Sequence, residues 1–194
     1  MSNLKRHENA CTDETELKIN GDNGWLWVIA TNSSVGYWIA GTYSTRGKAV
    51  TLGLLSGYKG IIIHDDWKPY SFISTASRQL DLLHVDRWIE RAEVRHGIEP
   101  EPLFGGRPPI LTRRGCLPRE FIAFVDGVRN IFSSAVHASD EPEKSRRRAF
   151  TVVRGKLSAL LAVRWKDRDA AHIAAELRRR FGVLFTFLQQ CNVP

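Results

Sequence analysis

Hydrophobic residues in the first third of the chain follow patterns typical of β-strands. The run from Gly24 to Thr31 is rich in aromatic and β-branched residues, and the turn residues Asn, Gly and Asp precede it. Val35 to Ala40 repeats this pattern, and a further candidate strand, Asn9 to Ile19, lies upstream. Strand-forming runs separated by turn residues predict neighbouring antiparallel strands. We therefore expect three strands in series at the start of the chain.

The next segments alternate between helical and strand patterns. A hydroxyl residue can cap a short helix from Ala49 to Leu55. Lys59 to His64 is a β-branched run bounded by glycine and charge, as expected of a central strand covered on both faces. We expect another strand from Leu80 to Leu83 and a helix from Val85 to His96. Together these elements predict an α/β sheet of mixed direction with flanking helices.

The chain changes character near Gly97. Residues 97–118 are rich in proline and glycine, which predicts a loop. Beyond it, apolar residues recur at spacings of three and four, and these spacings predict helices at Arg119 to Ala138, Glu143 to Trp165 and Ala170 to Gln190. We expect an α/β core over residues 1–96, the loop over 97–118 and a helical region over 119–194.

Charge is unevenly distributed between the two halves of the 194-residue chain. Residues 1–104 hold 11 basic and 13 acidic residues, whereas residues 105–194 hold 17 and 8. A basic region favours a polyanionic partner, because Lys and Arg that neutralise phosphates release condensed counterions. The alternative is a solvated basic surface without a partner.

The remaining composition bounds the class of protein. Its 43% hydrophobic content suffices for a core, and no apolar run approaches the ~20 residues that cross a bilayer. The three cysteines are scattered and never form a CxxC pair, which fits a reducing compartment and gives no thiolate zinc site. We expect a protein of the cytoplasm with no membrane partner.

Two carboxylates stand out chemically. Asp13 lies within the first predicted strand, and Asp65 follows the strand that ends at His64. Carboxylates that converge at strand ends can hold Mg²⁺, which prefers oxygen ligands and supports phosphoryl transfer. The alternative for each residue is a solvated position in a strand or turn.

Several short segments resemble one family when they are taken together. They are, in chain order, Asp13-Glu14-Thr15, Asn20-Gly21, Trp25 to Val28, Ser44 to Lys48, Ile63-His64-Asp65 with Tyr70, and Gln79-Leu80 with His84 and Arg87. In this order the segments resemble insertion-sequence transposases of type 66, which are DDE transposases with an RNase H-like core. The resemblance extends from about Asp13 to Arg95.

The resemblance implies roles for individual residues. Asp13 and Asp65 match the first and second acids of the catalytic triad, which implies that both bind Mg²⁺ or Mn²⁺. Asp66, which stands where the family usually has glycine, is a candidate neighbour of the site together with His84 and Arg87. The third acid of the family would fall shortly after Pro194. We therefore expect a catalytic-core fragment for DNA transposition that is inactive alone.

Basic residues complete the candidate set. Arg46 and Lys48 at a helix start, and the run Lys144, Arg146, Arg147 and Arg148, are candidates for contacts with DNA phosphates. The alternative function is a non-catalytic remnant of a transposase that binds DNA or another protein. The sequence leaves open whether the chain forms a homo-oligomer.

Overall fold

The computed structural model describes residues 9–40, 55, 57–65, 67–74, 76–97 and 119–189. The described residues form two compact units, which divide between Asp81 and Leu82. The predicted helix Ala49 to Leu55, apart from Leu55, lies outside the described residues. The predicted loop, apart from Gly97, also lies outside them.

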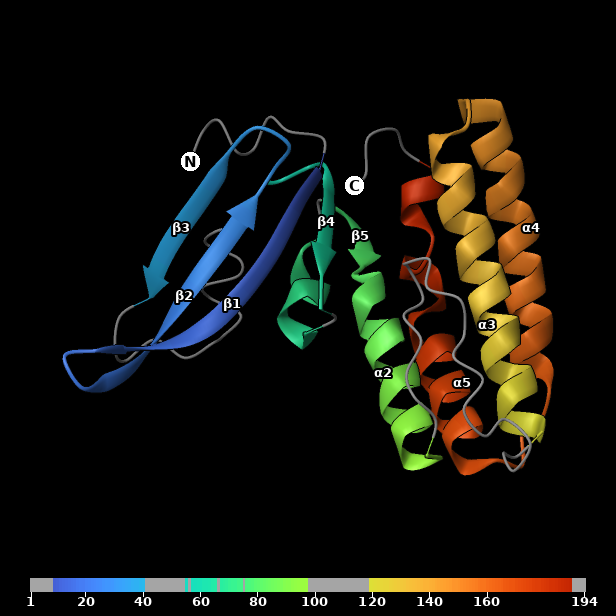
Figure 1. The fold of residues 1–194 in the computed structure, drawn as a ribbon. Helices are drawn as coiled ribbons and strands as arrows, with labels where there is room; N and C mark the ends of the chain where they lie inside the picture. The colour runs from blue at the N-terminus through green and yellow to red at the C-terminus, as the bar shows by residue number, and fades with distance from the viewer. Residues whose placement is uncertain are drawn as a thin grey trace. The chain divides into compact units, whose positions relative to one another are not determined.

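The first unit is built on a five-stranded sheet (Figure 1). Its strands are β1 (Asn9–Ile19), β2 (Asp22–Ala30), β3 (Val35–Ala40), β4 (Ile61–His64) and β5 (Ser77–Leu80). They lie in the order β3-β2-β1-β4-β5. The strand β2 is antiparallel to both β1 and β3, and β4 is parallel to both β1 and β5. This arrangement confirms the predicted mixed α/β fold and is consistent with an RNase H-like sheet.

A two-residue turn fixes the register of the first hairpin. Ile19 pairs with Asp22, so Asn20 and Gly21 alone make the connection. Their φ angles are 51° and 93°, which is the left-handed region that Asn and Gly tolerate best. The Asn-Gly pair therefore sets which residues of β1 and β2 face each other.

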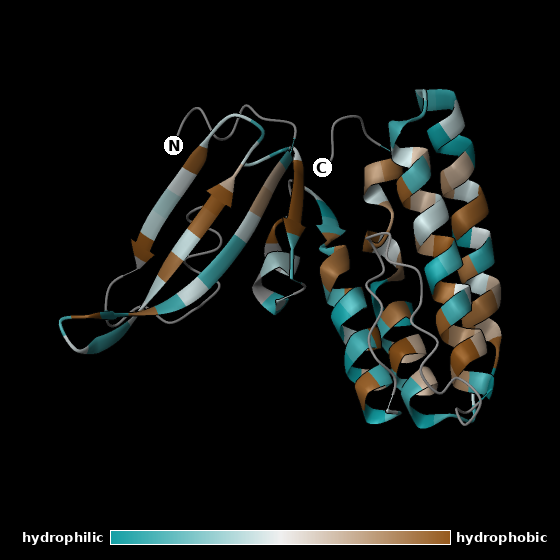
Figure 2. Cartoon of the chain, viewed as in Figure 1, coloured by the Kyte–Doolittle hydropathy of each residue, from teal (hydrophilic) through white to brown (hydrophobic). Residues whose placement is uncertain are grey.

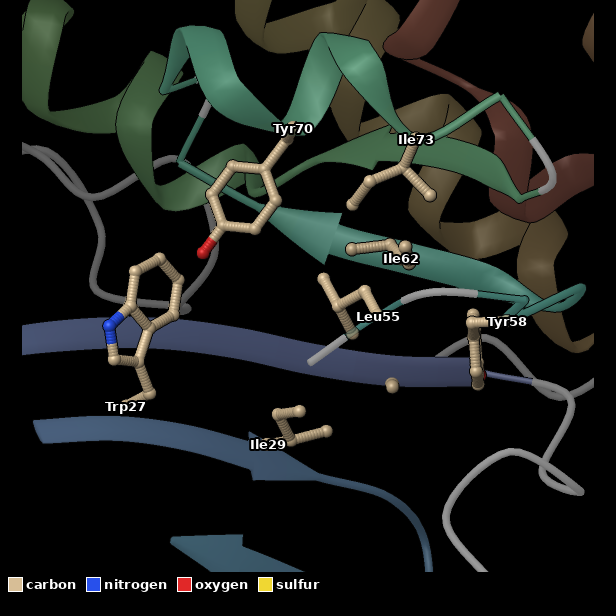
Figure 3. Packing of buried hydrophobic residues seen from close by; sticks show 8 residues of the cluster. Trp27, Ile29, Leu55, Tyr58, Ile62, Tyr70 and Ile73 are labelled. Atoms are coloured by element: carbon tan, nitrogen blue, oxygen red, sulfur yellow. The ribbon is translucent and has the colours of Figure 1, made fainter. Parts of the chain in front are cut away.

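One face of the sheet packs on an apolar cluster (Figure 3). Trp27 and Ile29 from β2 and Ile62 from β4 meet Leu55 and Tyr70 from the connecting segments. The cluster also includes Ala10, Tyr58 and Ile73, and Trp25 and Trp67 pack against its edge. Trp27 is fully buried in this cluster, and the opposite face of the sheet points away from it.

The second unit is a group of helices (Figure 1). They are α2 (Leu82–Arg95), α3 (Arg119–His137), α4 (Glu143–Ala162) and α5 (Arg168–Arg180). Hydrophobic and hydrophilic bands alternate along them in Figure 2, as expected of helices that each bury one face. Phe132 of α3 contacts Phe185, and Phe124 contacts Trp165, so aromatic residues join the helices to their connections.

The predicted strand from Leu80 to Leu83 is wrong. The strand is Ser77–Leu80, and α2 begins at Leu82. The N–H of Asp81 still donates to the carbonyl of His64, and Asp81 then occupies the position before the helix, where aspartate is favoured. Leu83 is 51% exposed, whereas Val85 and Ile89 are buried at helical spacing.

The predicted ends of the last two helices also need correction. The helix α4 ends at Ala162 rather than at Trp165, whose indole N–H donates to the carbonyl of Leu160. The helix α5 runs from Arg168 to Arg180 and gives way to two 3-10 turns, η5 (Phe181–Val183) and η6 (Thr186–Leu188). Side chains that satisfy the last carbonyls allow a helix to stop early.

Candidate functional site

Asp13 lies within β1 on the face away from the apolar cluster. Its neighbours Thr12 and Glu14 are buried, whereas Asp13 is exposed, in keeping with the alternation of side chains along a strand. One carboxylate oxygen of Asp13 accepts a hydrogen bond of 2.9 Å from the N–H of Glu14. The side chains of Thr12 and Glu14 thus face the core, and the side chain of Asp13 faces the solvent.

Asp65 lies directly after the end of β4. Its carboxylate Oδ1 accepts a hydrogen bond of 2.9 Å from the N–H of Trp67, and this bond closes a tight turn at Asp65. The last paired positions of β1 and β4 are Cys11 and Ile63. Asp13 and Asp65 each stand two residues after this last pair, Asp13 within β1 and Asp65 just past the end of β4.

The same register leads to a third carboxylate. Ile63 pairs with Gln79 of β5, and two residues further along stand Asp65 and Asp81. Burial raises the pKa of the Cys11 thiol, and the negative charge of Asp81 raises it further. The sequence analysis places Asp81 inside a predicted strand, but β5 ends at Leu80 and Asp81 follows it directly.

The donor set of the acid pair suits a hard divalent cation. Mg²⁺ binds carboxylate oxygens, and both Asp13 and Asp65 provide them. Among the described residues, however, no group of three or more His, Cys, Asp or Glu side chains is arranged to hold a metal ion. Asp13 and Asp65 could therefore supply only part of a complete coordination sphere.

A buried polar network lies behind the acid pair and is not evident from the sequence. The hydroxyl of Tyr70 donates to Glu14 Oε2 at 3.0 Å and lies 2.9 Å from Thr12 Oγ1. The ring of His64 stacks on that of Tyr70 at 4.7 Å between centroids. Strand alternation alone places Thr12 and Glu14 opposite Asp13, but no sequence signal identifies their partner.

The structure does not relate the other predicted neighbours of the site, His84, Arg87 and Asp66, to the two acids. His84 and Arg87 lie in the first two turns of α2, three residues apart on one helix face, and so belong to the second unit. Asp66 lies outside the described residues. The proximity of all three to the acids stays a prediction.

The basic run on α4 is only partly exposed. Lys144, Arg147 and Arg148 are exposed, and Arg147 pairs with Glu143 at 2.6 Å. Arg146 is only 9% exposed, which leaves little of its side chain for a contact with DNA. Arg46 and Lys48 lie outside the described residues.

Glu176, an acid in α5, forms ion pairs with two arginines. Arg179 donates to its Oε2 at 2.8 Å, and Arg180 donates to the same oxygen. Burial raises the pKa of Glu176, but the hydrogen bonds from these two arginines outweigh burial and lower it. Glu176 is therefore an ion-pair residue within α5.

Comparisons with known proteins identify one family that shares the first half of the sequence. Residues 1–101 match the model of a family described as the IS66 family of transposases. Searches among curated proteins and among solved structures found no match. In the described part of the chain, a helix long and apolar enough to span a membrane is absent.

Proposed function

Since the chain belongs to the IS66 family of transposases, we propose that its first unit carries part of a metal-dependent site for DNA phosphodiester chemistry. Asp13 and Asp65 are the ligands in this proposal. The observation that supports it is the parallel pairing of β1 with β4, whose last pair, Cys11 and Ile63, stands two residues before each acid. Their match to the first two acids of the family's triad supports the same assignment.

The chain's own residues would orient the cation and the phosphate. Asp13 is held by the strand β1, and Asp65 is held by its bond from the N–H of Trp67. Bound between such carboxylates, a divalent cation supplies Lewis-acid stabilisation of charge that develops on a phosphodiester. Because two carboxylates supply only part of a coordination sphere, we expect these residues to bind the metal weakly.

Metal binding tests the proposal directly. Binding of Mn²⁺, followed through the electron paramagnetic resonance signal of the free ion, should weaken by more than about tenfold in Asp13→Asn and in Asp65→Asn. Glu16→Gln is the matched control, because Glu16 is an exposed carboxylate on the same strand. Equal affinities in the wild type and both Asn variants would contradict the assignment.

We further propose that DNA is the partner of the second unit. The helix α4 has six basic residues and one acidic residue, and Lys144, Arg147 and Arg148 are exposed. Phosphate contacts by such residues give binding that depends on salt and not on base sequence. Transposition acts on DNA, so a surface of this kind serves the family's activity.

A further inference from the structure

The hydroxyl of Tyr70 is bonded to both residues that flank Asp13. It donates to Glu14 Oε2 at 3.0 Å and lies within hydrogen-bond distance, 2.9 Å, of Thr12 Oγ1. Because the Tyr70 hydroxyl uses its hydrogen in the bond to Glu14, its oxygen accepts a hydrogen bond from the Thr12 hydroxyl. The backbone of Asp13 is thereby held from the face opposite its own side chain.

The rest of Tyr70 is connected to both sides of Asp65. Its ring stacks on His64, which directly precedes Asp65, at an interplanar angle of 25°. Its N–H donates to the carbonyl of Trp67, and the N–H of Trp67 in turn donates to Asp65 Oδ1. A single side chain and its backbone thus contact the segments that hold both acids.

The surroundings of Tyr70 make these contacts rigid. Its side chain is fully buried beside Trp27 (Figure 3). The rings of Trp27 and Trp67 meet it edge-on, with centroids at 6.4 and 6.1 Å. Burial raises the pKa of Tyr70 far above its ordinary value, and the charges of Glu14 and Asp65 raise it further. The hydroxyl therefore keeps its proton at neutral pH, and water does not compete for its partners.

We propose that Tyr70 is a positioning residue for the acid pair. Its hydroxyl fixes the part of β1 that carries Asp13, and its ring and backbone fix the turn that carries Asp65, so the two carboxylates keep a constant separation. This inference rests on the function proposed above for Asp13 and Asp65. Tyr70 in this role contacts neither the metal nor DNA.

The first test measures the positioning itself and needs no metal. Tyr70→Phe keeps the ring and removes the hydroxyl. Amide hydrogen exchange in the metal-free protein should become on the order of tenfold faster at residues 12–14, because the hydrogen bonds of the hydroxyl hold this segment closed. Tyr58→Phe is the matched control, since Tyr58 is a second buried tyrosine of the same apolar cluster. Equal exchange at residues 12–14 in the two variants would overturn the proposal.

The second test measures the consequence for the site. The affinity for Mn²⁺ should fall about tenfold in Tyr70→Phe and stay near the wild-type value in Tyr58→Phe, although both variants lose some thermal stability. Thr12→Val, which removes the other hydroxyl of the network, should change affinity in the same direction by a smaller factor. Wild-type affinity in Tyr70→Phe would overturn the proposal.

The two tests separate this inference from the proposed function. If Asp13→Asn and Asp65→Asn bind Mn²⁺ as the wild type does, the proposed metal site fails. The exchange measurement still decides whether Tyr70 fixes the two segments, because it depends only on the folded chain. Slower exchange or no change in Tyr70→Phe would show that the hydroxyl does not hold β1.

Discussion

Glu93 of α2 is a buried carboxylate whose charge is matched by Arg129 of α3. The guanidinium contacts both carboxylate oxygens, at 2.7 and 2.9 Å, and Glu93 is only 3% exposed. A buried charge that loses its partner keeps its desolvation cost without the compensating attraction. The pair therefore makes the packing of α2 on α3 sensitive to one residue.

Removal of one partner should cost more than removal of both. Arg129→Met should lower the free energy of unfolding by about 3–5 kcal/mol, measured by urea denaturation, because it leaves Glu93 buried and unmatched. Glu93→Met combined with Arg129→Met should recover most of that stability, since no buried charge of this pair remains. A double variant as unstable as the single one would show that packing, and not the uncompensated charge, causes the destabilisation.

At the scale of single residues, the sequence identifies chemistry better than it identifies contacts. Asp13 and Asp65 can be singled out because a carboxylate in or just after a predicted strand is recognised from the residues next to it in the sequence. The hydrogen bond between Thr12 and Tyr70 joins residues 58 positions apart, and no local pattern predicts such a pairing. Alternation along β1 does predict that Thr12 and Glu14 face away from Asp13.

The start of α5 depends on a carboxylate cap. Asp167 precedes the helix, and its Oδ1 accepts hydrogen bonds from the N–H groups of Asp169 and Ala170 at 3.0 and 2.9 Å. The carboxylate of Glu120 in α3 accepts from the N–H groups of Lys166 and Asp167. Two side chains thus satisfy four N–H groups around the start of the helix, where the helix itself supplies no acceptors.

Loss of this cap should destabilise the second unit. Asp167→Ala should lower the free energy of unfolding by about 1 kcal/mol, because two N–H groups lose their acceptor. Asp167→Asn should stay close to the wild type, since its amide oxygen can accept the same bonds, and this variant separates capping from the attraction to His96, 3.7 Å away. Asp140→Ala, at an exposed acid, is the control. A large destabilisation in Asp167→Asn would indicate that charge matters more than capping.

At the scale of elements, the type of a segment is more predictable than its ends. Sequence patterns predict the strands β1 and β3 and the helix α3 almost to the residue, because these patterns are long or bounded by turn residues. The segment from Leu80 to Leu83 is ambiguous, because four residues of mainly apolar character fit a strand and a helix equally well. Only Val85, Ile89 and Ala92, buried at a helical spacing, reveal where α2 lies.

At the scale of the whole chain, the sequence predicts the antiparallel neighbours that short turns connect, but not the pairing between distant strands. The hydrophobic pattern does not reveal that β1 lies between β2 and the much later β4. The family resemblance implies that the strands of Asp13 and Asp65 meet, and the pairing of Cys11 with Ile63 is consistent with it. The helices of the second unit follow from their long and regular apolar spacing alone.

The uneven charge of the chain predicts that it binds DNA in a manner that depends on salt. Affinity for a duplex of arbitrary sequence, measured by fluorescence anisotropy, should fall steeply as salt rises, because bound cations displace counterions from the phosphates. Changing Lys144, Arg147 and Arg148 together to Gln should make the plot of log affinity against log salt shallower. The slope should change by about 0.9 for each phosphate that these cations neutralise in the wild type.

The matched control changes Arg164, Lys166 and Arg168 together to Gln. These three cations are also exposed and lie just beyond the other end of α4, so both variants lose three charges. The helix continues for 14 residues from Arg148 to its end at Ala162, a rise of about 21 Å, which is too far for one phosphate to contact both groups. If only the first triple flattens the slope, the start of α4 follows the DNA backbone. Equal flattening by the two triples would instead attribute binding to net charge alone, and the basic run on α4 would then be a solvated surface.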